Sequence, residues 1–383
     1  MKTPRASSMA NSPSQAQSFL SDDELWTFPD PPPTGSWGPD FLGPGFEAQT
    51  LPLLINDAED DPVATLVRYL PHNDPKALAG TPSTPTFTLL YLHGWNDYFF
   101  QTHLARQIAR LGGAFYALDL RRYGRSLRKG QMRGWCDDLT IYDEDISAAF
   151  AVLREERPWD SSLIMMGHST GGLIASIWAD RHPGALDALI LNSPWLELQG
   201  SSLLRMLGEP VVNTLARRDP TMPIMPRRQD VDAFFDIHLG WNEDRDGPMT
   251  HDDWKDDPYV TGWNVYWPFK QRPTPPIRPG WMQAIMAGHA RVAQGLSITC
   301  PVFVMLSAHS HFGFGWNDQA RHTDTVIDAP ATAKRAVQLG NLVTIARFEG
   351  ALHDVTLSEP PVREQAMSAM RRWVSSYVLG QKE

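Results

Sequence analysis

The fold is decided by residues 163–179, which read LIMMGHSTGGLIASIWA. An apolar run precedes a Gly-x-Ser-x-Gly motif centred on Ser169, and a second apolar run of helical character follows it. A strand, a sharp turn and a helix in this order form the context of a nucleophile elbow. The serine of such a turn takes a strained backbone conformation, and Gly167 and Gly171 remove side chains that would collide there. The stretch therefore predicts a serine nucleophile above the N-terminus of a helix, which favours developing negative charge.

Composition narrows the possible functions. The chain has 383 residues, a formal net charge of −10 and no long Lys/Arg run, so a nucleic-acid partner is not expected. We find no apolar run of about 18 residues and no apolar core of a secretory signal near the N-terminus, so we expect no membrane span and a cytoplasmic location. Cys136 and Cys300 fit neither a metal spacing nor a disulfide framework, and we expect two reduced, partly buried thiols. No metal and no organic cofactor is expected, and the oligomeric state is left open.

Short apolar segments alternate with helix-like segments over most of the chain. This alternation predicts the α/β class, with a mostly parallel central sheet flanked by helices. The expected strands are residues 46–55 and 63–70 as a leading antiparallel pair, then 87–92, 114–120, 163–166, 188–191, 301–306 and 342–348. The expected helices of this part are residues 103–111, 139–156 and 362–379.

The alternation is interrupted between residues 195 and 299, which carry helical, acidic, Trp-rich and Pro-rich stretches. We interpret 195–299 as an inserted cap over the carboxyl edge of the sheet, where open α/β sheets bind ligands. Residues 46–194 and 300–383 form the expected core. Residues 1–45, rich in Pro and Ser, are expected to be a flexible N-terminal arm.

In this fold the catalytic residues follow the order nucleophile, acid, base. His353 stands just past the last expected strand and before the last helix, so we predict that it is the base. His168 is the rival, but its side chain is expected to point away from the partner of an elbow serine and to support the turn.

Four carboxylates are candidates for the acid: Asp318, Asp324, Asp328 and Asp354. We favour Asp324 and keep Asp328 as the second choice, because Asp354 is adjacent to the base and cannot readily fold back onto its ring. The acid holds the imidazole in the correct tautomer and stabilises the imidazolium.

An oxyanion hole needs two N–H groups aimed at the developing alkoxide. One is expected from Thr170, the residue after the nucleophile. The other is expected from Trp95, because Gly94 lets the chain turn tightly after the strand at residues 87–92.

Five motifs in order carry a family resemblance: LHGW at 92–95, DLRRYGRS at 119–126, GHSTGG at 167–172, DTVID at 324–328 and GALH at 350–353. The set resembles the α/β-hydrolase superfamily, and within it the monoacylglycerol lipase/lysophospholipase branch, grouped with serine aminopeptidase-like hydrolases. The resemblance implies that the first aspartate of the Asp-x-x-x-Asp stretch is the acid, which supports Asp324. The chain departs from that branch in its large Trp95, in the residues 307–322 between strand and acid, and in a longer, Trp-rich cap.

Together these features predict a serine carboxylic-ester hydrolase that forms an acyl-enzyme, acting on an apolar or aromatic small ester or a monoacyl lipid. Five cap tryptophans are candidates for the substrate pocket: Trp195, Trp241, Trp263, Trp267 and Trp281. The alternative for these rings is that they attach the cap to the sheet. The alternative functions are an amidase or peptidase of the same fold, and a non-catalytic binding module, which the complete set of triad residues disfavours.

Overall fold

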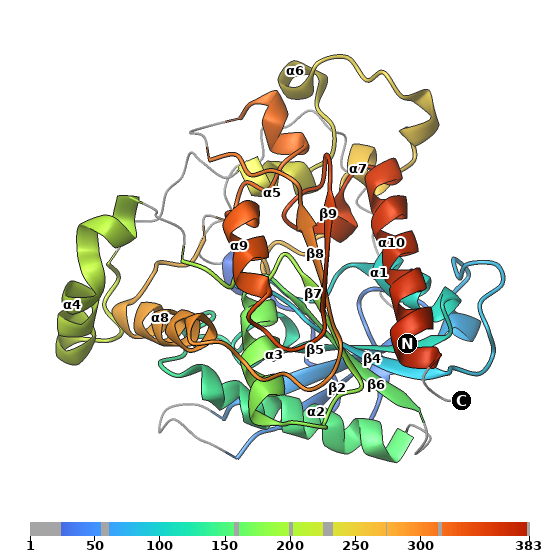
Figure 1. The fold of residues 1–383 in the computed structure, drawn as a ribbon. Helices are drawn as coiled ribbons and strands as arrows, with labels where there is room; N and C mark the ends of the chain where they lie inside the picture. Colours follow the sequence, from blue (N-terminus) through green and yellow to red (C-terminus); the bar gives the residue numbers. More distant parts are fainter. Residues whose placement is uncertain are drawn as a thin grey trace.

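A central sheet organises the computed structural model, which describes residues 24–54, 61–156, 161–198, 202–224, 233–272, 274–312 and 316–380. Its nine strands lie in the order β1-β2-β3-β5-β4-β6-β7-β8-β9 (Figure 1). The strands are β1 Gly38–Pro39, β2 Phe46–Pro52, β3 Val63–Tyr69, β4 Phe87–Leu92, β5 Gly113–Asp119, β6 Ser162–His168, β7 Ala188–Asn192, β8 Val302–Ser307 and β9 Val343–Phe348.

Strand direction divides the sheet into two parts. The pairs β1–β2, β2–β3 and β3–β5 are antiparallel, whereas every pair from β5 through β4 to β9 is parallel. All residues of β4 and β6 are buried, as expected where helices cover both faces of a parallel sheet. The expected fold class is confirmed, including the leading antiparallel pair.

Helices form a layer on each face of the sheet (Figure 1). The helices of the core are α1 Thr102–Arg110, α2 Tyr142–Glu156, α3 Thr170–Arg181, α9 Ala329–Ala336 and α10 Pro360–Val374. Buried side chains of α1 and α10 share one apolar cluster with the sheet, and those of α2, α3 and α9 share another on the opposite face. The sheet is thereby enclosed, and its carboxyl edge is left to carry the site.

The segment between β7 and β8 contains helices and no strand among its described residues. These helices are α4 Ser202–Arg218, which is broken at Gly208, then α5 Ala233–His238, α6 Glu243–Asp246, α7 Pro258–Thr261 and α8 Pro279–Ala293. Helix α8 belongs to the buried layer: an added Cβ at Gly288 would lie 2.7 Å from Leu139 and 3.3 Å from Ile177. We keep 195–299 as the proposed extent of the cap, with α8 joining it to the sheet.

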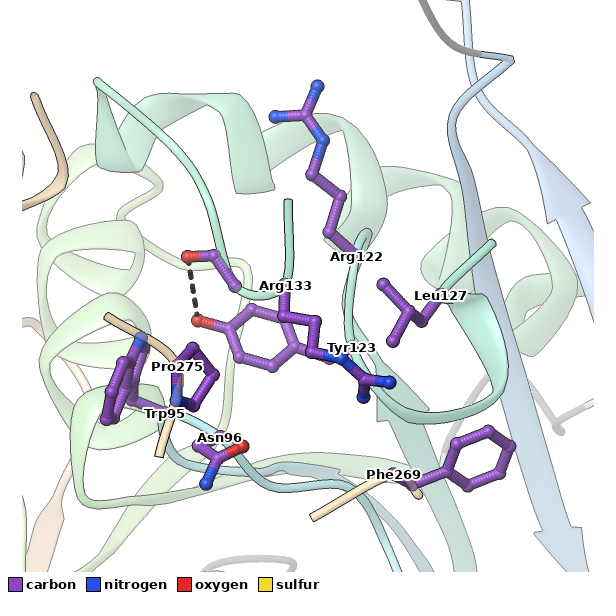
Figure 2. Close-up of a pocket in the computed structure, with 9 residues that line it drawn as sticks. Trp95, Asn96, Arg122, Tyr123, Leu127, Arg133, Phe269 and Pro275 are labelled. Atoms are coloured by element: carbon purple, nitrogen blue, oxygen red, sulfur yellow. Dashed lines mark hydrogen bonds between the residues drawn. The ribbon is translucent and has the colours of Figure 1, made fainter. Parts of the chain in front are cut away.

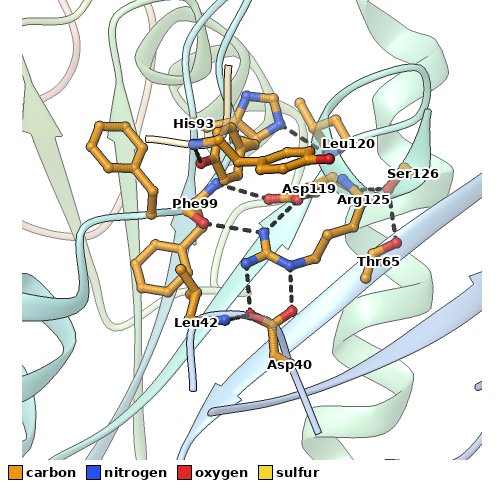
Figure 3. A network of polar contacts seen from close by, with 12 residues as sticks. Asp40, Leu42, Thr65, His93, Phe99, Asp119, Leu120, Arg125 and Ser126 are labelled. Carbon is orange, nitrogen blue, oxygen red and sulfur yellow. Dashed lines mark hydrogen bonds and ion pairs between the residues drawn. The ribbon is translucent and has the colours of Figure 1, made fainter. Parts of the chain in front are cut away.

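The N-terminal arm needs a new boundary. Residues 1–23 of the expected arm lie outside the described residues, but β1 pairs with β2, so the sheet begins before residue 46. Asp40 adds a buried ion pair, with its Oδ2 2.6 Å from Nε of Arg125 (Figure 3). The described part of the arm is therefore docked on the core from at least Gly38.

Helix α9 was not expected from the sequence. Asp328 is its N-cap, and its carboxylate accepts a hydrogen bond from the N–H of Ala331 at 2.9 Å. Pro330 stands in the first turn, where a proline costs no hydrogen bond. An aspartate followed by a proline is a helix-start signal, so the sequence did contain the information.

Both cysteines are free and buried in the structure, as the sequence predicts. Among the described residues, no helix has the length and apolar character needed to cross a membrane.

Candidate active site

The nucleophile elbow lies between β6 and α3. Ser169 has φ 52° and ψ −120°, a conformation that side chains rarely adopt and that points to a built-in strain. A Cβ at Gly167 would lie 2.6 Å from the carbonyl oxygen of Gly171, and a Cβ at Gly171 would lie 2.2 Å from that of His93. Gly167 is thus required for the turn itself, and Gly171 for its packing against the end of β4.

His353 joins the serine to a carboxylate. Its Nε2 lies 2.9 Å from Oγ of Ser169, and its Nδ1 lies 2.9 Å from Oδ2 of Asp324. The other carboxylate oxygen of Asp324, Oδ1, accepts hydrogen bonds from the backbone N–H groups of Val326 and Ile327, each at 2.8 Å. In this arrangement Nδ1 donates to Asp324, which leaves Nε2 free to accept the serine proton.

A local backbone pairing returns Asp324 to the end of β8. Asp324 forms an isolated parallel bridge with Ser310: its N–H donates to the carbonyl of His309 at 3.0 Å, and its carbonyl accepts from the N–H of His311 at 2.9 Å. Asp324 therefore lies beside residues that closely follow β8, although it comes later in the chain.

The other candidate carboxylates have different surroundings. Asp328 caps α9, and Asp318 begins a 3₁₀ turn that ends at Arg321. The carboxylate of Asp354 has other partners: it accepts hydrogen bonds from Nδ2 of Asn192 at 2.7 Å and from Nε2 of Gln101 at 3.1 Å.

The carboxylate of Asp354 is held in its ionised form. Burial by itself raises its pKa, but nearby His168 and hydrogen bonds from Thr356, Asn192 and Gln101 hold that pKa well below its usual range. Asn192 also accepts the N–H of Val355 at 3.1 Å, so the loop that carries His353 is tied to the end of β7. Sequence reasoning missed Asn192 and Gln101; the available signal was the position of Asn192, a polar residue at the carboxyl end of a buried apolar strand.

His168 lies behind the base. Its Nδ1 is 3.1 Å from the carbonyl oxygen of Asn192, and its ring centroid is 4.9 Å from that of His353. Burial lowers the pKa of His168, while the nearby carboxylate of Asp354 acts in the opposite direction. The structure thus places His168 against His353, rather than only beneath the turn.

Two backbone N–H groups are candidates for the oxyanion hole. Thr170 is the first residue of α3, so its N–H has no acceptor within the helix. Gly94 is packed on the nucleophile, with an added Cβ only 3.0 Å from Cβ of Ser169. Nδ1 of His93 lies 2.7 Å from the carbonyl oxygen of Gly94, and because a trans peptide points its N–H opposite to its C=O, the N–H of Trp95 faces away from His93.

His93 is itself anchored to the sheet. Its Nε2 accepts the N–H of Leu120 at 3.1 Å, so its Nδ1 carries the hydrogen that reaches Gly94 (Figure 3). In the same network Asp119 accepts the N–H of Phe99 at 2.9 Å and pairs with Arg125 at 2.8 Å. The loop between β4 and α1, which carries Trp95, is therefore tied to the end of β5.

Two of the candidate pocket tryptophans lie near the nucleophile. The N–H of Trp195 donates to the carbonyl oxygen of Ser169 at 3.0 Å. The ring of Trp281 lies 6.2 Å from that of Trp195 and 5.1 Å from that of Trp95. These three rings, from the β4–α1 loop, the β7 end and α8, form an aromatic group beside the elbow.

The other three candidate tryptophans make different contacts. Trp263 packs at 4.6 Å against the ring of His103 on α1. Trp241 lies 4.9 Å from the guanidinium of Arg321, and Trp267 lies 6.3 Å from the ring of Phe235. Trp263 is buried in a cluster with Leu352, so it attaches the cap to the core.

Trp95 also lines a pocket (Figure 2). Residues of the β4–α1 loop, of the segment after β5 and of the cap line it together: Trp95, Asn96, Arg122, Tyr123, Leu127, Arg133, Gly134, Phe269 and Pro275. Neither Ser169 nor His353 is in its lining. Within the described part of the chain, no group of three His, Cys, Asp or Glu side chains could hold a metal ion.

The sequence matches a known protein family. A family model described as serine aminopeptidase, S33, matches residues 83–311, which is more than half of the chain. The chain belongs to this hydrolase family. The matched range of the hydrolase includes Ser169 and ends before Asp324 and His353.

Similar proteins point to the same branch of α/β-hydrolases. The hydrolase is 32% identical over 116 residues to a monoacylglycerol lipase of Mycolicibacterium smegmatis, covering 30% of this chain and 40% of that protein. It is 31% identical over 100 residues to lysophospholipase L2 of Escherichia coli, covering 26% of this chain and 29% of that protein. The hydrolase therefore spans less than half the length of either relative. The resemblance to the monoacylglycerol lipase-like branch is confirmed.

Solved structures share the fold at low identity. A monoacylglycerol lipase from Paleococcus ferrophilus matches with a TM-score of 0.51 and 19% identity, covering 77% of this chain and 96% of that one. A soluble variant of monoglyceride lipase from Saccharomyces cerevisiae matches with a TM-score of 0.55 and 14% identity, covering 86% and 96%.

Proposed function

We propose that this hydrolase is a serine carboxylic-ester hydrolase in which Ser169 is the nucleophile, His353 the base and Asp324 the acid. The observation that carries the proposal is the continuous hydrogen-bonded chain from Ser169 Oγ through both ring nitrogens of His353 to Asp324, with 2.9 Å at each step. The strained backbone of Ser169 and the burial of the other two side chains support it.

The reaction follows from these positions. Ser169 Oγ attacks the ester carbonyl while Nε2 of His353 takes its proton, and Asp324 stabilises the imidazolium. The N–H groups of Thr170 and Trp95 receive the negative charge on the carbonyl oxygen. The alcohol leaves with the proton from His353, and His353 then activates a water that releases the acid from Ser169. Each step uses the chain's own residues.

The proposed substrates are small esters with an apolar or aromatic group, or monoacyl lipids. The aromatic group of Trp95, Trp195 and Trp281 beside the elbow supports an apolar subsite, since such rings line ligand pockets. The relatives named as a monoacylglycerol lipase and a lysophospholipase support an ester of a fatty acid.

A second candidate is an amidase or peptidase that uses the same residues. The family description, serine aminopeptidase, favours it. Amide cleavage places a further demand on His353, which must protonate a poorer leaving group, and the same triad geometry serves both reactions.

The two candidates separate in one assay. We would measure hydrolysis of p-nitrophenyl esters from acetate to palmitate, p-nitrophenyl benzoate, and aminoacyl p-nitroanilides by the wild type and Ser169→Ala. Ester turnover that is lost in Ser169→Ala supports the proposal, and the preferred acyl length measures the pocket. Turnover of anilides alone would favour the amidase, and equal rates for both proteins would contradict the nucleophile.

A further inference from the structure

The loop that carries Trp95 is clamped by the cap. Asn96, Asp97 and Tyr98 follow Trp95 directly, and the side chain of each contacts residues 266–271, which we call the cap strap. The phenol oxygen of Tyr98 accepts the N–H of Tyr266 at 2.6 Å.

The amide of Asn96 pairs with one residue of the strap in both directions. Its Nδ2 donates to the carbonyl oxygen of Gln271 at 2.8 Å, and its Oδ1 accepts the N–H of Gln271 at 3.1 Å. Both residues are buried. Asn96 has φ 53°, a left-handed conformation that asparagine and glycine tolerate best. The pairing therefore holds Asn96, the residue that directly follows Trp95, in place.

An ion pair between Asp97 of the loop and Lys270 of the cap strap is a second connection. Nζ of Lys270 lies 2.8 Å from Oδ1 of Asp97, and the two side chains are 2% and 4% exposed. Loss of one partner of such a buried pair is costly, because the other charge is left without compensation. Nζ of Lys270 also lies 5.4 Å from the ring centre of Phe100, within cation–π range. The strap is thus attached to the loop by groups that are unfavourable to separate.

The peptide before Trp95 is held from the opposite side. His93 fixes the carbonyl of Gly94, and the strap fixes Asn96, so the Trp95 N–H lies between two anchors. One anchor belongs to the core and the other to the cap.

We propose that the cap strap positions the oxyanion hole, with Asn96 and Lys270 as positioning residues that act through the N–H of Trp95. This proposal rests on the proposed serine hydrolase function. If the strap positions this N–H, the cap affects turnover by stabilising the transition state. This effect is separate from any contact that the cap makes with the substrate. Donors that are slightly misplaced lose much of their effect, because an oxyanion hole works by preorganisation.

The test uses variants that separate positioning from stability. Asn96→Gly removes both hydrogen bonds without strain at the positive φ. Asp97→Asn combined with Lys270→Met removes both charges of the pair, so neither is left buried alone. Arg272→Met is the matched control, since it breaks a neighbouring, more exposed cap ion pair of 2.8 Å with Asp236. For each protein we would measure thermal stability, kcat and KM on p-nitrophenyl butyrate, and inhibition by an alkyl trifluoromethyl ketone.

The ketone reports on the oxyanion hole, because its adduct with serine carries the negative oxygen. We expect kcat to fall about 10- to 100-fold in Asn96→Gly and in the double variant, less than the loss of a whole oxyanion donor, with KM changed less than about threefold. The inhibition constant of the ketone should rise with the fall in kcat, and Arg272→Met should match the wild type. An unchanged kcat in folded Asn96→Gly and double variants would overturn the proposal, as would losses that follow thermal stability alone.

Failure of the underlying function looks different. If the wild type neither hydrolyses the ester nor reacts with the ketone, the serine hydrolase proposal fails and the positioning role falls with it. If the wild type is active and depends on Ser169, only the positioning role is at risk.

Discussion

Oδ2 of Asp324 lies 2.9 Å from Nδ1 of His353, although the strand that precedes Asp324 ends at Ser307. The bridge between Ser310 and Asp324 explains this relationship, because it places Asp324 beside residues that closely follow β8. A long excursion of the chain can therefore be inserted between strand and acid without moving the carboxylate.

The first prediction separates the two candidate acids. Asp324→Asn should lower kcat by about 10⁴-fold, because an amide at this position favours the wrong tautomer of His353. Asp328→Asn should stay close to the wild type, since asparagine is also a good N-cap for α9. Steady-state ester hydrolysis and circular dichroism of both variants check this. Loss of activity in Asp328→Asn with a normal Asp324→Asn would reverse the assignment.

Local sequence patterns were sufficient to predict that Ser169 stands in a strand–turn–helix and that His353 follows the last strand. Ser169 directly follows the buried strand β6, and His353 stands in the loop after the partly buried strand β9; a strand end is visible in a short window of sequence. The range of β4 and the existence of the leading antiparallel pair were predicted for the same reason, although β2 ends at Pro52 rather than at residue 55.

Long-range contacts could not be predicted in this way. The return of Asp324 to Ser310, the ties of Asp354 to Gln101 and Asn192, and the clamp of Asn96 on Gln271 join segments far apart in the sequence. The same limit applied to the tryptophans, since composition could not tell Trp281 beside the elbow from Trp263 in the contact of cap and core.

The second prediction concerns these two tryptophans. Trp281→Leu should raise KM for p-nitrophenyl benzoate more than for the acetate, because it removes an aromatic surface next to Trp95 and Trp195. Trp263→Leu should lower the thermal stability and leave the ratio of the two KM values unchanged, since this ring packs between cap and core. If the ratio of the two KM values changed equally in both variants, Trp281 and Trp263 would not have these different roles.

The third prediction is a loss of stability in acid that depends on His289. Burial lowers the pKa of His289 from 6.5 to about 4, while its Nε2 donates to the carbonyl of Trp195 at 2.8 Å. Because the unfolded chain binds the proton first as the pH falls, the stabilisation is complete above about pH 6.5 and is lost towards pH 4.

His289→Gln removes this titration and keeps a side-chain donor for Trp195. Urea unfolding at pH 7 and pH 4.5 should show a smaller fall in the free energy of unfolding for the variant, with a difference of about 2 to 3 kcal/mol at 1.36 kcal/mol for each pKa unit. Parallel falls for wild type and variant would show that His289 is not the group that titrates.

The fourth prediction concerns the thiols. Burial raises the pKa of Cys136 to about 12 and that of Cys300 to about 11, so almost no thiolate is available near neutral pH. Iodoacetamide should leave the native protein unmodified and alkylate both residues in urea, as intact-protein mass spectrometry can measure. Rapid alkylation of the native protein would mean that one of these thiols is accessible.

The most direct test of the central claim is the site of covalent reaction with a fluorophosphonate. Such a probe needs an activated serine, and the account predicts one stoichiometric adduct on the peptide that contains Ser169, with none in Ser169→Ala and a strong loss of rate in His353→Ala. A folded wild-type protein that stays unlabelled, or an adduct at a different residue that persists in Ser169→Ala, would contradict the account.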